Sequence, residues 1–154
     1  MTVLARIRPM ISLLAVVVVL AFALAPPPSL RHLDPLVARV REAGLPVDVS
    51  VEGAPVALPP GMDATAYRIV QEALTNALAH AGPATASVVI RYDDDRLELE
   101  IGDTGVGPVG GSRGHGLAGM RERVSRFDGR LETGPRPGGG FLVRADLPLQ
   151  PGRP

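Results

Sequence analysis

Gln71-Glu-Ala-Leu-Thr-Asn-Ala-Leu-Ala-His-Ala81, with Asp103-Thr-Gly-Val-Gly107 after it, is the part of the sequence that decides the fold. The first stretch is apolar with helical spacing, and it carries Glu72, Asn76 and His80 four residues apart. Four residues turn an α-helix by about 400°, so the three side chains form one stripe along the helix. The second stretch puts a carboxylate at a strand end, before two glycines that let a ligand approach the backbone. Together the two stretches indicate a nucleotide site.

The composition excludes several classes of function. Lys and Arg number 16, and so do Asp and Glu, so the net charge is zero and no nucleic-acid surface is indicated. Cysteine is absent, which excludes disulfides, thiol nucleophiles and zinc thiolate sites. Aromatic residues are scarce, so we expect a core of Ala, Val, Leu and Ile, which suits a compact α/β layer fold.

The N-terminal part of the sequence contains an apolar run. Residues 10–25 include one polar residue, Ser12, and Pro26-Pro-Pro28 closes the run. As a helix the run would be about 24 Å long, short of the roughly 30 Å hydrocarbon core, but local thinning of the bilayer would let it anchor. We expect it to tether the following domain to the inner, cytoplasmic face of the membrane. A cleaved signal peptide and a mis-assigned start are the alternatives.

Helical and strand patterns alternate in the rest of the chain. We expect helices at 33–43, 62–80 and 116–127, and strands at 47–51, 87–92, 97–101, 130–133 and 141–147. The long helix is expected to bury Ala66, Ile69, Val70, Ala73, Leu74, Ala77 and Leu78. This order favours an α/β chain in the form of an α+β two-layer sandwich, with a mixed sheet and three helices on one face.

The polar stripe of the long helix has a chemical interpretation. Asn76 stands where Ala or Leu would form helix better, and its amide oxygen suits Mg²⁺, which binds few protein ligands alongside phosphate oxygens and water. The alternative is a solvated Asn, and it is disfavoured because Glu72 and Asp103 are also present in the sequence as candidates for the same site. Glu72 is the catalytic candidate, since it can orient a nucleophile near phosphates, although a plain surface Glu has the same pattern. His80 fits a phosphate donor and a helix-terminal His equally well.

Two glycine-containing stretches complete the candidate site. The Asp103 carboxylate can accept a hydrogen bond from an exocyclic amine such as that of adenine, while Gly105 and Gly107 let the backbone pass the base. Gly114-His-Gly-Leu-Ala-Gly119 opens a helix whose first N–H groups make an anion site for phosphates. The alternative for residues 103–107 is a turn that binds no ligand, and the alternative for residues 114–119 is an ordinary helix start. No Gly-Lys-Ser/Thr of a Walker loop follows.

In combination these motifs resemble a known family. Residues 71–81 resemble the N box of bacterial sensor histidine kinases, and residues 103–107 their adenine-binding box. Residues 114–124 resemble the lid-and-helix box of the NarL-partner subclass within the GHKL ATPases. The resemblance implies a Bergerat-type fold with ATP and Mg²⁺ as cofactors and Asn76 as the Mg²⁺ ligand. The cofactor-binding residues it implies are Asn76, His80, Asp103, Gly105, Gly107, Gly114, His115, Gly116, Leu117 and Gly119.

The chain departs from the family pattern in three ways. Ala79 stands where the family usually has Arg or Lys, which removes one phosphate-binding charge, and Phe141 stands where many members have a Thr near the adenine. The dimerisation helices that carry the acceptor histidine in these kinases are not seen before residue 28, where the apolar run lies instead. We therefore assign residues 1–27 to an apolar segment, 28–150 to the ATPase domain with a linker helix at 28–45, and 151–154 to a tail.

The resemblance implies an ATP·Mg²⁺-binding catalytic domain. It would transfer the γ-phosphoryl group of ATP to a histidine supplied in trans by a dimerisation domain, with a response regulator as a further partner. The alternative is a nucleotide-binding or partner-binding module without catalysis, including a truncated kinase remnant. A serine kinase of the anti-sigma type is disfavoured by Gly119-Met-Arg-Glu-Arg123, which is typical of the NarL-partner subclass.

Overall fold

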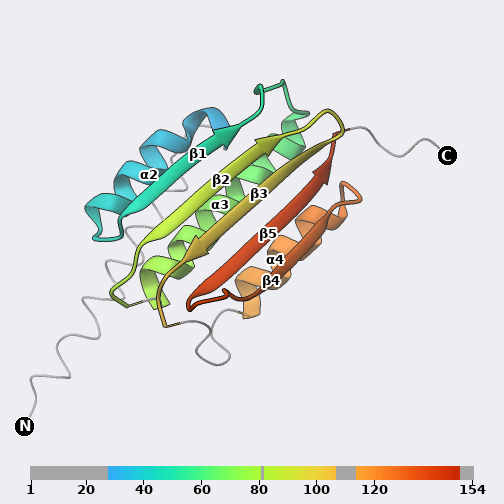
Figure 1. Cartoon of the computed structure of the whole chain (residues 1–154). Coiled ribbons are helices and arrows are strands. Elements are labelled where there is room, and N and C mark those ends of the chain that lie inside the picture. The colour runs from blue at the N-terminus through green and yellow to red at the C-terminus, as the bar shows by residue number, and fades with distance from the viewer. Residues whose placement is uncertain (1–27, 81, 107–113, 150–154) are drawn as a thin grey trace, which may run out of the picture.

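The computed structural model describes residues 28–80, 82–106 and 114–149 (Figure 1). Its elements, in chain order, are η1 Leu30–His32, α2 Leu33–Glu42, β1 Val47–Glu52, α3 Pro60–His80, β2 Ala86–Tyr92, β3 Arg96–Asp103, α4 Gly114–Ser125, β4 Arg130–Pro135 and β5 Phe141–Pro148. The order of elements expected from the sequence is confirmed. The expected ends are shifted by up to two residues, most visibly at α4, which begins and ends two residues earlier than the pattern indicates.

The five strands form one mixed sheet in the order β1-β2-β3-β5-β4. β1 and β2 are parallel, and α3 provides the crossover that parallel neighbours need. The remaining pairs, β2–β3, β3–β5 and β5–β4, are antiparallel. The three α-helices lie on one face of this sheet (Figure 1), so the expected two-layer architecture is confirmed.

The core lies between α3 and the helix side of the sheet. Alternate residues of β3 face it, and Leu97, Leu99 and Ile101 are buried there as the alternation predicts. α2 contributes to the same cluster through the buried residues Leu33, Leu36, Val37 and Val40. Of the residues expected to be buried in α3, Leu78 alone is exposed, by 40%, whereas its neighbour Ala77 is buried.

β1 is less buried than the alternation of its valines indicates. Val47 is buried, but Val49 is 37% exposed and Val51 is 51% exposed. Their neighbours across the parallel pair, Val88 and Ile90, are buried on the helix side, so the two exposed valines face that side as well. β1 is an edge strand, and the helix layer covers only its first part.

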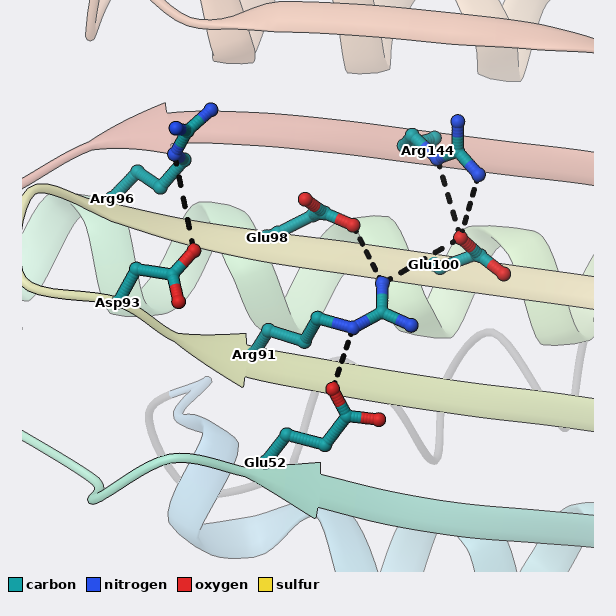
Figure 2. A network of polar contacts seen from close by, with 7 residues as sticks. All are labelled: Glu52, Arg91, Asp93, Arg96, Glu98, Glu100 and Arg144. Atoms are coloured by element: carbon teal, nitrogen blue, oxygen red, sulfur yellow. Dashed lines mark hydrogen bonds and ion pairs between the residues drawn. The ribbon is translucent and has the colours of Figure 1, made fainter.

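The other face of the sheet carries charged side chains that pair across strands (Figure 2). The Arg91 guanidinium on β2 lies 2.6 Å from both the Glu52 and the Glu98 carboxylates, and Arg144 on β5 lies 2.8 Å from Glu100. Hydrogen bonding from Arg144 lowers the pKa of the Glu100 carboxyl, with a smaller contribution from Arg91. This face is therefore polar and internally charge-paired.

The apolar run at residues 10–25 lies outside the described residues, and so does the helix expected there. Among the residues that the structure describes, no helix combines the length and the apolar character needed to cross a membrane.

Candidate functional site

The topology brings the polar stripe of α3 and the end of β3 to the same end of the sheet. α3 ends at His80, and β2 begins shortly afterwards at Ala86. Ala86 pairs with Asp103, the last residue of β3. The C-terminal half of α3 and the Asp103 carboxylate therefore lie at one end of the two-layer sandwich, with α4 packed against α3 beside them.

Asp103 is a buried carboxylate at a strand end. Its residue is 4% exposed and continues the alternation of Leu99 and Ile101 on the helix side. The Gly105 N–H donates to Asp103 Oδ1 at 2.9 Å, which closes a turn of the kind that Asp side chains form with the backbone two residues on. No described residue donates to Oδ2, so this oxygen can accept a hydrogen bond from a ligand.

Contacts from distant parts of the chain hold the turn after Asp103. The Thr104 N–H donates to the Thr85 carbonyl at 3.0 Å, and the Thr85 N–H donates to the Thr104 hydroxyl oxygen. On the other side, Gly140 has a φ of +98°, and its backbone lies so close to the Asp103 carbonyl that a Cβ would overlap it. The position of the Asp103 carboxylate is therefore fixed from two sides.

Glu72 of the polar stripe faces the start of α4. Glu72 and Asn76 are half-buried on α3, and neither has a hydrogen-bond or ion-pair partner among the described residues. A Cβ added to Gly116 would overlap the Glu72 carboxylate, so the first turn of α4 lies directly on that side chain. The absence of a side chain at Gly116 is what lets the two helices approach here.

The geometry agrees with a comparison against known protein families. Residues 61–151 match the family described as histidine kinase-, DNA gyrase B-, and HSP90-like ATPase. The chain belongs to this family. ATP is therefore the nucleotide that a site of this fold binds, and the end of the sheet with Asp103 is its candidate position.

Relatives of this ATPase domain include whole sensor histidine kinases. YxjM of Bacillus subtilis is 36% identical over 122 residues, which cover 78% of this chain and 30% of that protein. LnrJ of the same organism is 34% identical over 109 residues, which cover 71% of this chain and 27% of that protein. The chain thus spans less than a third of the length of these two relatives.

Solved structures share the fold of this ATPase domain. The blue-light activated histidine kinase of Erythrobacter litoralis EL346 is 25% identical with a TM-score of 0.61, over 79% of this chain and 42% of that one. The catalytic domain of the histidine kinase ThkA is 13% identical with a TM-score of 0.61, over 78% of this chain and 95% of that one. The second likeness concerns the fold alone.

The described part of the domain contains most of the residues predicted for the site. Gly116, Leu117 and Gly119 are half-buried near the start of α4, which begins at Gly114. Gly107 lies outside the described residues, and the side chains of His80 and His115 are not described. The structure thus brings the start of α4 onto Glu72, while the binding roles of all these residues stay predictions.

The residues present fit a magnesium ion that binds mainly to phosphate. Among the described residues there is no group of three or more His, Cys, Asp or Glu side chains that would hold a metal. Asn76 offers an amide oxygen without a partner in this part of the chain, one turn from the Glu72 carboxylate. Mg²⁺ keeps several waters and takes few protein ligands when phosphates are present, so this small donor set suits it.

Sequence reasoning missed the contacts that position Asp103. Gly140, Thr85 and Arg136 all lie beside the Asp103–Thr104 turn; the Arg136 guanidinium is 3.5 Å from the Asp103 carbonyl oxygen. The signal for Gly140 was present as Gly138-Gly-Gly140, three glycines that all have positive φ. Such a run of glycines is typical of a turn between strands, which it forms between β4 and β5, but its contact with β3 depends on strand order.

Proposed function

We propose that this chain is the ATP·Mg²⁺-binding catalytic domain of a two-component sensor histidine kinase of the NarL-partner subclass. The observation that carries the proposal is the meeting of α3 and α4, where Gly116 lies on the Glu72 carboxylate one turn from Asn76. Membership of the ATPase family and the sensor kinases among its relatives support it. The string Gly119-Met-Arg-Glu-Arg123 is the support for the subclass.

Each site residue has a distinct role in this proposal. Asp103 accepts a hydrogen bond from the adenine amine through Oδ2, and the glycines at 105, 107, 114, 116 and 119 let the backbone approach the nucleotide. Asn76 holds Mg²⁺, which when bound neutralises charge on the phosphate oxygens. Glu72 orients the incoming nucleophile or accepts its proton. Phosphoryl transfer needs little more than such positioning and charge stabilisation.

The acceptor in this proposal is a histidine supplied in trans. The imidazole nitrogen attacks the γ-phosphorus, the bond to the bridging oxygen breaks, and ADP leaves. A dimerisation domain would carry this histidine, and a response regulator would then receive the phosphoryl group. The tether expected from residues 10–25, its localisation at the inner membrane face, and the domain limits at 27 and 150 remain predictions.

Calorimetry on Asn76→Ala tests the site. Parent chain should bind ATP in the presence of Mg²⁺, and Asn76→Ala should lose at least about tenfold in affinity, which corresponds to about 1.4 kcal/mol. Thr75→Ala is the matched control, because Thr75 is the preceding residue, is exposed and hydrogen-bonds only along its own helix. If the parent binds no nucleotide, the proposed function is wrong.

Phosphoryl transfer is tested with a separately purified dimerisation domain of a sensor kinase. Radiolabel from the γ-phosphate should appear on that domain as phosphohistidine, which is labile in acid and stable in base. Acid-stable phosphoserine on a partner would instead assign the chain to the anti-sigma type of kinase. Binding without any transfer would leave a nucleotide-binding module or a kinase remnant.

A further inference from the structure

A second hollow lies on the helix side of β1, away from the nucleotide site. It is a cavity of 720 Å³ between η1, the start of α3, the second half of β1 and the loop that follows it. Its apolar wall is formed by Leu30, Val49, Val51, Val56, Leu58 and Tyr92. Three of these are among the exposed large hydrophobic residues of the described chain, Val49 by 37%, Val51 by 51% and Val56 by 49%. We call this hollow the β1 groove.

The β1 groove and the nucleotide site lie at opposite ends of α3. Asp63, which lines the groove, lies in the first turn of α3, and Asn76 follows thirteen residues later. At 1.5 Å per residue the two positions are about 20 Å apart along the helix axis. An occupant of the groove therefore does not compete with the nucleotide.

The described chain begins at the rim of the β1 groove. Ser29 lines it and has an extended backbone, with φ −151° and ψ 145°. The next residue is held in place, because the Leu30 N–H donates to Asp63 Oδ1 at 2.8 Å. Asp63 is in the first turn of α3, where a carboxylate is favoured by the helix dipole. Ser29, the second of the described residues, is thus held at the edge of the groove.

The sequence that arrives there is apolar. The run at residues 10–25 ends four residues before Ser29, and those four steps span at most about 14 Å. A helix with its side chains is about 10–12 Å across and rises 5.4 Å per turn, so one turn fills on the order of 500 Å³. The groove volume of 720 Å³ accordingly suits one to two turns.

We propose that residues 20–25, Leu-Ala-Phe-Ala-Leu-Ala, pack into the β1 groove of the same chain. The occupant is attached beside the groove, so its effective concentration is on the order of millimolar, which no separate partner matches at ordinary abundance. Its side chains match the aliphatic wall, and packing there removes Val49, Val51 and Val56 from water. Residues 20–25 cannot lie in a bilayer and in the groove at the same time, so this proposal replaces the membrane tether for the last turns of the run.

Disulfide trapping in the full-length chain tests this proposal, since the sequence contains no cysteine of its own. The first variant combines Leu20→Cys with Val51→Cys, and the matched control combines Leu20→Cys with Ser50→Cys. Val51 and Ser50 are neighbours on β1 and point to opposite faces of the sheet, so only Val51 faces the groove. Val51 is half exposed, so the substitution leaves the core intact.

We expect the Leu20/Val51 pair to form an intramolecular disulfide at least about tenfold faster than the Leu20/Ser50 pair under mild oxidation. Equal rates, or no disulfide in either variant, would overturn the proposal, as would recovery of the uncrosslinked chain on lipid vesicles. A covalent dimer through Leu20/Val51 would also overturn it, because the occupant would then be a second copy. The affinity for Mg-ATP is measured on the same sample. A chain that binds Mg-ATP but forms no Leu20/Val51 disulfide would contradict this proposal and leave the proposed function standing.

Discussion

Gly140 lies in the hairpin between β4 and β5, and its substitution tests whether this hairpin supports the carboxylate of Asp103. We expect Gly140→Ala to lower the free energy of unfolding by roughly 3 kcal/mol or more, because the new Cβ meets the Asp103 carbonyl at a positive φ. Gly138→Ala is the matched control: its φ of +86° is equally unfavourable, but no atom lies within 4 Å of the added Cβ. It should cost about 1 kcal/mol.

Urea denaturation of the two variants gives the comparison. The difference between them isolates the overlap with β3 from the backbone strain that both share. Folded Gly140→Ala should also bind ATP more weakly, since the turn that positions Asp103 has moved. Equal losses of stability in the two variants would mean that the hairpin makes no close contact with Asp103.

Substitution of Gly116 tests whether the close contact between α4 and Glu72, the catalytic candidate, matters for activity. In Gly116→Ala the new methyl group displaces the flexible end of Glu72, while Ala improves helix propensity by about 0.8–1 kcal/mol. We expect stability within about 1 kcal/mol of the parent but a loss of at least about tenfold in phosphoryl transfer to an acceptor domain. Gly134→Ala on β4 is the control, because nothing lies within 4 Å of its added Cβ. A fully active Gly116→Ala would show that Glu72 is not used.

Single residues of the site differ in how well the sequence predicts them. Asp103 and Asn76 stand out because their chemistry is wrong for their surroundings, an acid at the end of an apolar strand and an amide in an apolar helix. The support given by Gly140 and Thr85 does not stand out, because it depends on which strands become neighbours. Such contacts join residues far apart in the sequence, and no local pattern encodes them.

At the scale of elements, the charged ladder across β1, β2, β3 and β5 makes stability depend on pH. Arg144 lowers the pKa of Glu100 below its ordinary value of 4.5. A carboxyl with a lowered pKa in the folded state stabilises the fold above pH 4.5, and this contribution is lost as the pH falls through the folded pKa. The Arg144 and Glu100 side chains are 43% and 26% exposed, so the contribution is about 0.5 kcal/mol.

Glu100→Gln measures that contribution. At pH 7 the variant should unfold about 0.5 kcal/mol more easily than the parent, and the difference should shrink as the pH is lowered below 4.5. Glu42→Gln, at the exposed last residue of α2, is the control for the removal of one carboxylate charge elsewhere on the surface. A gap between Glu100→Gln and the parent that stays constant in acid would exclude the depressed pKa as its cause.

The helices and strands themselves were predictable to the extent that their periods are local. The 3.6-residue stripe of α2 and the alternation of β3 gave the right faces, because each element is covered along its length by the core. The second half of β1 is less buried than its sequence pattern indicates. Its Val-x-Val alternation looks half-buried, but burial depends on whether a helix lies over an edge strand, and at this strand the helix layer ends early.

At the scale of the whole molecule, α3 connects two proposed sites that lie at its opposite ends. Its first turn holds the Leu30 N–H at the β1 groove, and its C-terminal half carries Glu72 and Asn76. Because α3 is also the central helix of the core, the groove end and the nucleotide end belong to one cooperative unit. Ligand binding at one end should therefore stabilise the complete fold rather than one half of it.

Thermal unfolding with and without Mg-ATP measures this linkage. A ligand at 100 times its Kd stabilises the folded state by about 2.7 kcal/mol, which for a domain of this size raises Tm by roughly 10 °C. Asp103→Asn keeps the oxygen that receives the Gly105 N–H but presents an NH₂ group to adenine in place of Oδ2, so the rise should nearly vanish. Asp93→Asn, in the exposed turn between β2 and β3, should retain the full rise. Chelation of Mg²⁺ with EDTA should reduce the rise in Tm of the parent, because Asn76 then contributes no metal-mediated contact. A rise in Tm that is unchanged by EDTA would exclude Mg²⁺, and Asn76 as its ligand, from the proposed site.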